Sequence, residues 1–449
     1  MRLWPVALLV GPALLVLGEP LGALTLDEVL VRVYLESPRL AGARARLRAT
    51  DEGVPQALGG WRPRLSATSG GAFSQTSTDD GEQTLGTLRQ VVNLVQPVYS
   101  GGATTAETAR AENEVLAERA RLALVEQEVL VEAVDAFTAV TRDRAVLELA
   151  VRNERRLGEQ LTGTSDRYRF GELTKTDVAQ AETRLARGTA DRVRAEGELA
   201  MSGARYRRVV GGDPDELAAP EPVAGKPFAS VEAPALAEAA PAVLAARYAL
   251  DGARDQGDVA VAQTRPKLSL DGQAGYEREP STLIDYQRGF TVGATLSIPL
   301  YQGGGEYARI RQARQTVTER RHALDQAHRL AEEDLIAADA ALRTAEARIG
   351  SLESQVDSAT AALDGVRQEA LVGARTVLDV LDAEQELFAA EVELTRARRE
   401  AVMAGYRMLA ARGELSVAGL GLEVEPYDPE GHYREVRDKW YGLGEDRSE

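Results

Sequence analysis

The sequence predicts a mixed fold in which pairs of β-strands alternate with very long α-helices. Three observations along the 449 residues carry this prediction. A set of landmarks occurs twice, two pairs of segments alternate apolar with polar residues, and two long stretches contain no proline. An apolar period of two is typical of strands, whereas a sustained spacing of three and four is typical of helices.

Five pairs of landmarks indicate that the chain is internally duplicated. In each pair the second member follows the first at an offset that is constant to within one residue. The pairs are Pro38 with Pro241, Pro63 with Pro266, Pro97 with Pro299, Gly171 with Gly373, and Asp177 with Asp379. A register held over so many residues predicts two structural units with the same layout.

Four segments are predicted in order. Residues 1–23 have the form of a signal peptide, because Arg2 is followed by an apolar run from Val6 to Leu17 that is too short to span a bilayer. The first structural repeat is predicted at 24–225 and the second at 226–420, joined by a connector rich in Pro, Ala and Gly. Residues 421–449 are expected to be a mobile C-terminal tail.

Two strands are predicted in each repeat, at about 64–76, 85–96, 267–277 and 288–298. In the last of these, Phe290, Val292 and Ala294 alternate with Thr291, Gly293 and Thr295. This alternation favours a strand with one apolar and one wet face. The loops between paired strands are polar and are expected to face solvent.

Each strand pair is followed by a predicted helical hairpin, at about 103–210 and 305–412. No proline occurs between Pro97 and Pro214 or between Pro299 and Pro426. From Leu335 to Ala370 alanine alternates with larger apolar residues at a spacing of three and four, which indicates a heptad seam and closely packed helices. The stretch from Ala103 to Tyr168 has 65 steps and would form a helix roughly 100 Å long. Its charged faces indicate that it projects into water.

The composition excludes several classes of function. The formal net charge of −17 argues against a nucleic-acid partner, which requires a basic face. The absence of cysteine removes disulfides, thiolate catalysis, cysteine metal sites and an acyl-cysteine lipid anchor. His322, His328 and His432 are interpreted as solvated surface, so we expect no metal, no cofactor and no catalytic site.

Four strands per chain are too few to close a barrel. An open sheet edge in lipid would leave backbone groups unpaired at several kcal/mol each. Three chains would supply twelve strands, which is a sensible closed barrel, and would bring their long helices together as a tube. The predicted fold class is therefore a membrane β-barrel continued by a coiled-coil helical tunnel, with the barrel closed by trimerisation.

Several doubled motifs give the chain a resemblance to a known family. They are the strand starts Pro63-Arg64-Leu65-Ser66 and Pro266-Lys267-Leu268-Ser269, the strand-to-helix turns at Pro97, Tyr99, Gly101, Gly102 and at Pro299, Tyr301, Gly303, Gly304, and the helix reversals at Gly171 and Gly373. In these the sequence resembles the TolC family of outer-membrane channel proteins, to about Leu420. The resemblance implies a homotrimeric exit duct of a tripartite efflux pump or a type I secretion system. It further implies an outer-membrane location projecting into the periplasm, with membrane lipid, a periplasmic adaptor (membrane fusion) protein and an inner-membrane transporter as partners.

The resemblance also implies roles for residues at the two helix reversals. Asp379 and Asp382 match aspartates that narrow the pore, and three residues match a latch that holds it shut: Arg375, Thr176 and Asp177. The reversals themselves, Gly171, Glu172, Leu173, Gly373 and Ala374, are expected to contact the adaptor. Spacing alone favours another interpretation about as strongly, in which Thr174 with Asp177 and Thr376 with Asp379 are helix capping boxes.

Two other classes of function remain open from the residues. A periplasmic coiled-coil adaptor or structural protein without a pore would use the same long helices, but it gives no reason for two matched alternating strand pairs. An exported enzyme would need a convergent acid, base or metal site, whereas the charged residues here are spread along helix faces. Tyr99 and Tyr301 are interpreted either as aromatic residues at a membrane edge or as simple turn packing.

Overall fold

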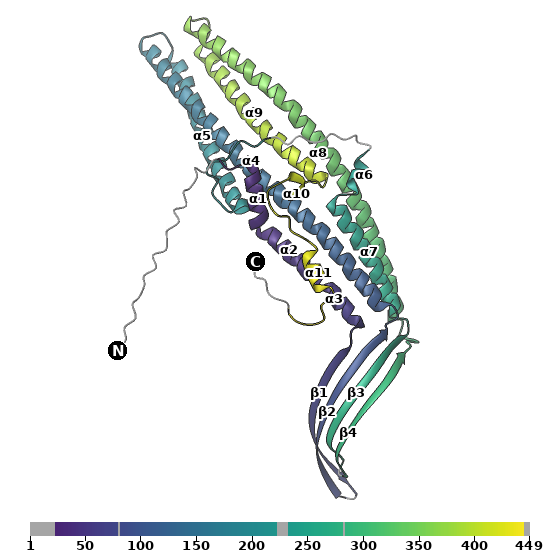
Figure 1. Cartoon of the computed structure of the whole chain (residues 1–449). Helices are drawn as coiled ribbons and strands as arrows, with labels where there is room; N and C mark the ends of the chain where they lie inside the picture. The colour runs from purple at the N-terminus through teal and green to yellow at the C-terminus, as the bar shows by residue number, and fades with distance from the viewer. Residues whose placement is uncertain (1–22, 80, 222–231, 282, 444–449) are drawn as a thin grey trace, which may run out of the picture. The chain divides into compact units, whose positions relative to one another are not determined.

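The computed structural model describes residues 23–79, 81–221, 232–281 and 283–443, so the expected signal segment 1–23 lies almost entirely outside the described residues. The chain divides into two compact units. The hairpin unit comprises the described residues of Met1–Val33, Ala133–Pro222 and Leu352–Val402. The strand unit comprises those of Tyr34–Glu132, Val223–Ser351 and Met403–Glu449. Figure 1 shows the elements of both.

The strand unit contains one antiparallel sheet of four strands in the order β1-β2-β3-β4. The strands are β1 (Arg64–Thr78), β2 (Gly81–Tyr99), β3 (Lys267–Ser281) and β4 (Ile284–Ser297). They are longer than expected at the turn between β1 and β2 and at the turn between β3 and β4, because polar residues there continue the ladder, as Ser77 does opposite Glu82. The sequence-distant strands β2 and β3 pair directly, with Val92 opposite Ala274.

The sheet is exposed on both faces in the described chain. Every residue of β4 is exposed, and large apolar side chains such as Leu65 (72% exposed) and Phe290 (83%) stand free of contact with the core. The outer edges of β1 and β4 carry no partner strand among the described residues. Exposed apolar surface and unpaired strand edges of this length are typical of surfaces that other chains or lipid cover.

Short helices precede each strand pair within the chain. They are α1 (Leu26–Glu36), α2 (Pro38–Asp51), α3 (Gly53–Leu58) and the 3₁₀ turn η1 (Gly59–Trp61) before β1, and α6 (Ala233–Ala237) and α7 (Pro241–Ala262) before β3. Ser37 caps α2 by accepting a hydrogen bond from the Leu40 amide, and Pro38 occupies the first turn, where its missing N–H is not needed.

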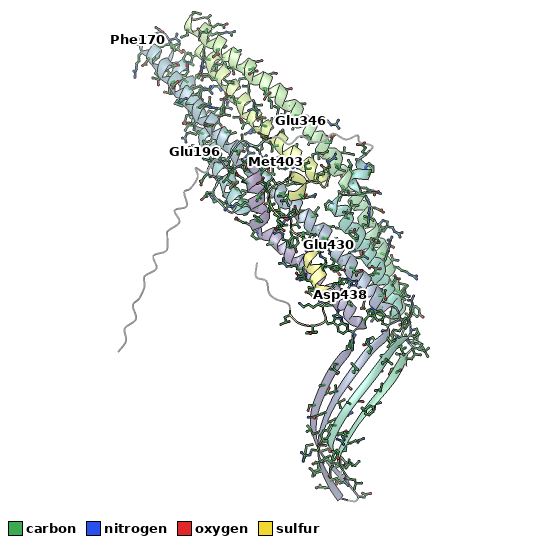
Figure 2. All side chains as sticks on the ribbon, viewed as in Figure 1. Phe170, Glu196, Glu346, Met403, Glu430 and Asp438 are labelled. Carbon is green, nitrogen blue, oxygen red and sulfur yellow. The ribbon has the colours of Figure 1, made fainter. Side chains whose placement is uncertain are left out.

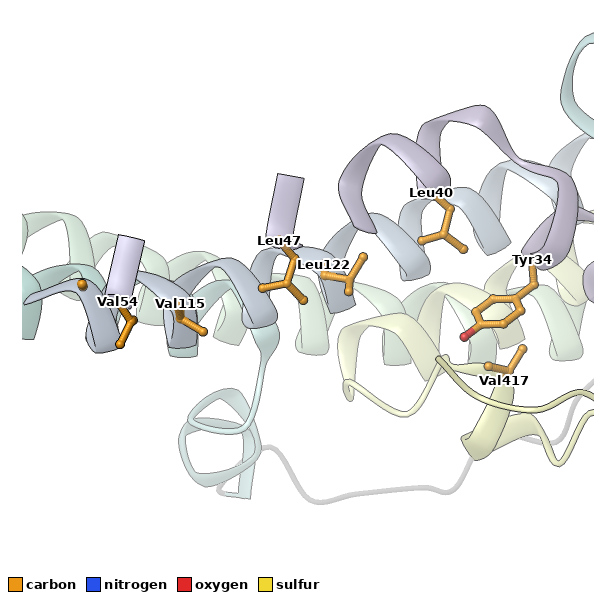
Figure 3. Packing of buried hydrophobic residues seen from close by; sticks show 8 residues of the cluster. Tyr34, Leu40, Leu47, Val54, Val115, Leu122 and Val417 are labelled. Carbon is orange, nitrogen blue, oxygen red and sulfur yellow. The ribbon is translucent and has the colours of Figure 1, made fainter. Parts of the chain in front are cut away.

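The core of the strand unit lies between α2 and the first half of α4 (Ala103–Arg169). Figure 3 shows Leu47 of α2 beside Leu122 of α4, and Val54 beside Val115. Tyr34 and Val417 close the same cluster from the two ends of the chain. Fully burying each such aliphatic side chain stabilises the unit by about 1.5–3 kcal/mol.

The hairpin unit contains four long helical segments and the first part of α1, up to Val33. The long helices α4 and α8 (Gly305–Leu371) reach into it with their C-terminal parts, and α5 (Lys175–Val210) and α9 (Val377–Ala411) return. Apolar contacts join different helices, as in the cluster of Val146 and Leu149 of α4, Ala195 of α5, and Phe388 and Val392 of α9. None of the helices that the structure describes is long and apolar enough to cross a membrane.

Glycines inside the predicted helices do not interrupt them. Gly158 and Gly163 lie within α4, and Gly188 and Gly197 lie within α5. At Gly188 a Cβ atom would lie 2.8 Å from the Leu157 Cδ1 atom, so this glycine lets α5 approach α4 closely. Close packing there offsets part of the roughly 1 kcal/mol that glycine costs relative to alanine in a helix.

The expectation of a mobile C-terminal tail is wrong for the residues that the structure describes, up to Leu443. After α10 (Val417–Leu420) the chain forms α11 (Gly431–Val436) and packs on the strand unit. Leu422, Val424, Tyr427 and Tyr433 contact the cluster around Leu47. The apolar residues of this segment are spaced irregularly between acidic and proline residues. Their burial could therefore not be predicted from a helical or strand period.

Candidate functional site

The candidate site consists of the two helix reversals of the hairpin unit. Gly171 and Gly373 adopt φ values of +79° and +78°, in the left-handed region that favours glycine. In both reversals the amide after the glycine donates to a carbonyl five residues earlier, at 2.9 Å from Glu172 to Arg167 and 2.9 Å from Ala374 to Glu369. This is the Schellman pattern that closes a helix C-terminus.

The returning helices begin with the predicted capping boxes. In α5 the Asp177 amide donates to the Thr174 hydroxyl at 3.3 Å, and the Thr174 amide donates to the Asp177 carboxylate at 2.8 Å. In α9 the Asp379 amide and the Thr376 amide repeat these bonds at 3.3 and 2.8 Å. The capping interpretation of both pairs is therefore confirmed.

Hydrogen bonding sets the charge state of the two capping aspartates. The Thr174 amide and hydroxyl hold the pKa of Asp177 below its usual range, because both donate to the carboxylate. The amide and hydroxyl of Thr376 lower the pKa of Asp379 in the same way, with a smaller contribution from the Arg375 charge. Both carboxylates are thus held ionised by local donors at the ends of their helices.

Arg375 is engaged within its own hairpin. Its Nε donates to a Glu369 carboxylate oxygen at 2.8 Å, and the guanidinium pKa is raised first by that bond and then by the charges of Glu369 and Asp379. Thr176 is exposed. The Asp177 carboxylate already accepts a hydrogen bond from the Thr174 hydroxyl. In this single chain the three latch candidates therefore lie on two separate reversals, each of which closes its own hydrogen bonds.

Asp382 joins the two hairpins. Its carboxylate forms an ion pair with Arg184 of α5, whose side chain is 25% exposed. Asp379 and Asp382 share one helical face, as their spacing predicts, but their carboxylates have different partners. Sequence reasoning missed Arg184. The available signal was its position two helical turns after Asp177, since a seven-residue spacing keeps a side chain on one face of a helix.

The tips of the two reversals expose apolar side chains. Figure 2 labels Phe170 at the first tip, where its side chain is 82% exposed, and Leu371 and Val372 are similarly exposed at the second. Glu172 is held by Arg167 at 3.0 Å. Leu173 packs inward with Leu157 and Leu381. Leu173 therefore supports the packing of the hairpins, and the exposed apolar surface lies on neighbouring residues outside the five predicted for adaptor contact.

The strand-to-helix turns of the strand unit also use left-handed glycines. Gly101 and Gly102 have φ values of +69° and +91°, and Gly303 and Gly304 have +71° and +80°. At Gly101 a Cβ atom would lie 2.7 Å from the Ala262 carbonyl oxygen, so no side chain fits. Tyr99 and Tyr301 are 46% and 79% exposed, so neither side chain is buried in the described chain.

Comparison with known proteins identifies the family. A family model described as outer membrane efflux protein matches residues 29–212 and 234–414. The outer membrane efflux protein BepC of Brucella suis is 33% identical over 93% of this chain and 92% of its own length. The outer membrane protein TolC of Vibrio cholerae is 27% identical over 91% of this chain and 95% of its own length.

Comparison with solved structures shows that the fold is that of an outer membrane channel. The crystal structure of the CmeC outer membrane channel of Campylobacter jejuni superposes with a TM-score of 0.79, over 92% of this chain and 89% of that one, at 14% identity. The two ranges that the family model matches cover both strand pairs and both helical hairpins. The chain therefore belongs to the outer membrane efflux protein family, whose members are channels of the outer membrane.

Proposed function

We propose that three copies of this chain form a closed duct that serves as the outer-membrane exit of an efflux pump or a type I secretion system. The single observation that carries the trimer is the sheet, whose four strands end in two long unpaired edges in the described chain. Pairing β4 of one copy with β1 of the next satisfies these edges, and twelve strands are a common size for a closed barrel. The exposed apolar residues of the sheet then face lipid.

We propose the helix reversals as the gate. Three-fold symmetry would place Asp379 and Asp382 in two stacked rings of carboxylates, with Arg375, Thr176 and Asp177 as the latch around them. The ion pair of Asp382 with Arg184 and the bond of Arg375 with Glu369 support a gate whose charged groups have partners within one subunit. When the proposed gate opens, these side chains could exchange ion-pair partners, and no unpaired charge would be buried.

We propose a periplasmic adaptor as the partner of the two tips and an inner-membrane transporter as the source of energy. The support is the exposed apolar surface at the reversals, where Phe170, Leu371 and Val372 flank Gly171, Glu172, Gly373 and Ala374. Apolar side chains of this exposure at a helix-hairpin tip mark a protein contact.

The test begins with the mass of the detergent-purified protein and its conductance in a planar lipid bilayer. A trimer that gives small, cation-selective steps supports the duct. A water-soluble monomer without conductance contradicts it.

Variants then test the gate. Asp379→Ala/Asp382→Ala is expected to raise single-channel conductance and to weaken block by multivalent cations. Asp382→Ala alone keeps the α9 capping box, so it separates pore charge from helix capping. The matched control is Asp357→Ala/Asp364→Ala, which removes two exposed aspartates of α8. Unchanged conductance in the Asp379/Asp382 variant would leave Asp379 as a helix cap only.

A further inference from the structure

The last described segment of the chain, residues 421–443, follows a defined path that we call the C-terminal strap. Its contacts begin at α1 and move steadily along the sequence through α2 to the residues before β1. The Tyr427 amide donates to the Tyr34 hydroxyl at 2.8 Å, His432 Nδ1 lies 3.2 Å from the Asp51 carboxylate, and the Lys439 carbonyl accepts from Arg62 at 2.7 Å. The strap therefore runs alongside α2 and α3 toward the start of β1.

Contacts with α4 give the same direction independently. Glu430 pairs with Arg119 at 3.0 Å, and Arg437 pairs with Glu112 at 3.4 Å, nearer the beginning of the helix. The Arg119 guanidinium also lies 5.2 Å from the centre of the Tyr433 ring. Figure 2 labels Glu430 and Asp438 on this path, with Asp438 nearer the strands. Two rows of contacts thus lead the strap to the helical end of the sheet.

The strap is clamped firmly at several points. The Arg44 guanidinium lies 4.5 Å from the Tyr34 ring and 5.2 Å from the Tyr427 ring, so a cation is held between two aromatic faces. Val436 of α11 is buried. Because these contacts fix the strap along its length, its last described residues are held at a defined position near the strand ends.

At that place the strap exposes an aromatic and apolar cluster. Trp440 is 66% exposed and Tyr441 is 90% exposed, and Leu443 is fully exposed. The Arg62 guanidinium lies 5.2 Å from the centre of the Trp440 ring and so anchors it next to η1. The Trp61 carbonyl accepts a hydrogen bond from Gln96 of β2 at 2.9 Å, which ties the cluster to the strand ends.

We propose that Trp440, Tyr441 and Leu443 of the C-terminal strap enter the phospholipid head-group region beside the first strand. This inference rests on the proposed function, in which the sheet crosses the membrane and its helical end lies at the inner-leaflet surface. Trp and Tyr favour that region because their rings are apolar at one end and polar at the other. Lys439, the exposed residue that precedes Trp440 in the strap, complements lipid phosphates.

The occupant that the chemistry favours is lipid and not a second protein surface. The cluster combines Trp, Tyr and Leu with the cations Arg62 and Lys439, and the charge of the adjacent Asp438 is balanced by Arg437 at 3.2 Å. Aromatic and apolar residues beside cations are typical of interfacial membrane anchors. It also adjoins strands whose apolar side chains are exposed down to the same end, since Val98 and Tyr99 of β2 are 44% and 46% exposed. The strap lies outside both predicted repeats, and its cluster enlarges the exposed apolar surface of the strands.

The natural absence of cysteine allows a direct test. Tyr441→Cys carries one nitroxide spin label in the full-length protein, reconstituted in vesicles of phosphatidylethanolamine and phosphatidylglycerol. Collisions with oxygen, which concentrates in lipid, are compared with collisions with a water-soluble nickel chelate. The matched control is Met201→Cys, an exposed residue of α5 in the hairpin unit.

We expect the oxygen-to-nickel ratio to be severalfold higher at position 441 than at position 201. Adding Trp440→Ala to the Tyr441→Cys variant should lower the ratio severalfold, and an unchanged ratio would contradict the anchoring role of the indole. Equal ratios at 441 and 201 in conducting vesicles overturn the inference while the proposed function stands. A label at 441 that meets neither reagent overturns it in favour of a subunit contact. Vesicles without conductance count against the proposed function, and the inference falls with it.

Discussion

At the scale of single residues, Asp379 fits both interpretations of the reversals, as a helix cap and as a charged group of the pore. Asp379 is a helix cap by its bonds with Thr376, and the same bonds keep it ionised. Asp382 is not needed for the cap, and its carboxylate is paired with Arg184. The charge available to a passing cation therefore depends on Arg184 as well as on the two aspartates.

Arg184→Ala is predicted to strengthen block of the channel by multivalent cations. Removing the guanidinium frees the Asp382 carboxylate, and a unit charge at about 4 Å in water contributes about 1 kcal/mol, or about fivefold in blocking affinity. The measurement is the blocking concentration in a planar bilayer. Arg194→Ala is the control, because Arg194 lies on the same helix and pairs only locally with Asp191. Equal block in both variants would place Asp382 away from the ion path.

At the scale of elements, one contact that holds the C-terminal strap involves the carboxyl of Asp51, whose charged form is disfavoured by burial. Asp51 is buried to 1% exposure, and burial raises the pKa of its carboxyl while the bond from His432 opposes that shift. Glu52 lies 3.7 Å from the other His432 nitrogen, and Arg119 contributes a favourable charge from α4. We therefore expect the packing of α11 against α2 to depend on pH.

We predict that the strap is held more firmly in mild acid than at neutral pH. Folded Asp51 keeps its proton to a higher pH than the unfolded chain, whose carboxyl titrates near about 3.9, so the folded state binds more protons and stability falls as pH rises through that window. Ionising a buried carboxyl that lacks a full set of hydrogen-bond partners costs on the order of 1–3 kcal/mol, so the change is expected to be at least about fivefold.

Hydrogen exchange of the α11 amides at pH 5 and pH 8, corrected for intrinsic rates, measures this change. Asp51→Asn should remove most of the pH dependence, because the neutral amide keeps the shape of the carboxyl and does not titrate. Glu435→Gln is the control, since Glu435 is an exposed carboxylate on the same short helix. The same pH dependence in Asp51→Asn and in the unmodified protein would rule out Asp51 as its source.

At the scale of the whole molecule, the features of a single chain that lack a partner are concentrated on the sheet. The edges of β1 and β4 are open in the described structure, and both faces are exposed. Open edges of this length favour pairing with other chains, which is the physical basis of the proposed assembly. In the proposed trimer the edges would pair and lipid would cover the apolar face.

Cysteines placed on the two edge strands test the assembly. Thr68→Cys on β1 with Thr291→Cys on β4 should yield a covalent trimer with a flexible bismaleimide of about 10 Å, because neighbouring strands lie about 4.8 Å apart. The product is measured by denaturing gel electrophoresis. Gln90→Cys with Tyr276→Cys is the control, since these residues are paired within one chain and should give only monomer. Ladders beyond three, or dimers alone, would contradict three-fold closure.

Local chemistry determined much of what was predictable. Pro63 and Pro266 precede strands, Gly171 and Gly373 mark reversals, and the capping boxes follow from a Thr-x-x-Asp spacing. Each of these features depends on backbone preferences or on hydrogen bonds between residues a few positions apart. Strand ends were less well predicted, because polar residues continue a ladder whenever a partner strand is present.

By itself the sequence determined the order of strands and helices, the repeated landmarks and the family. Only the tertiary structure decided that Asp382 meets Arg184, that Leu173 packs inward, and that the tail is a strap with His432 against Asp51. The physical reason is distance along the chain. Periodicity and capping report interactions within a helical turn or a strand, whereas these contacts join residues on different elements, whose approach depends on how whole elements pack.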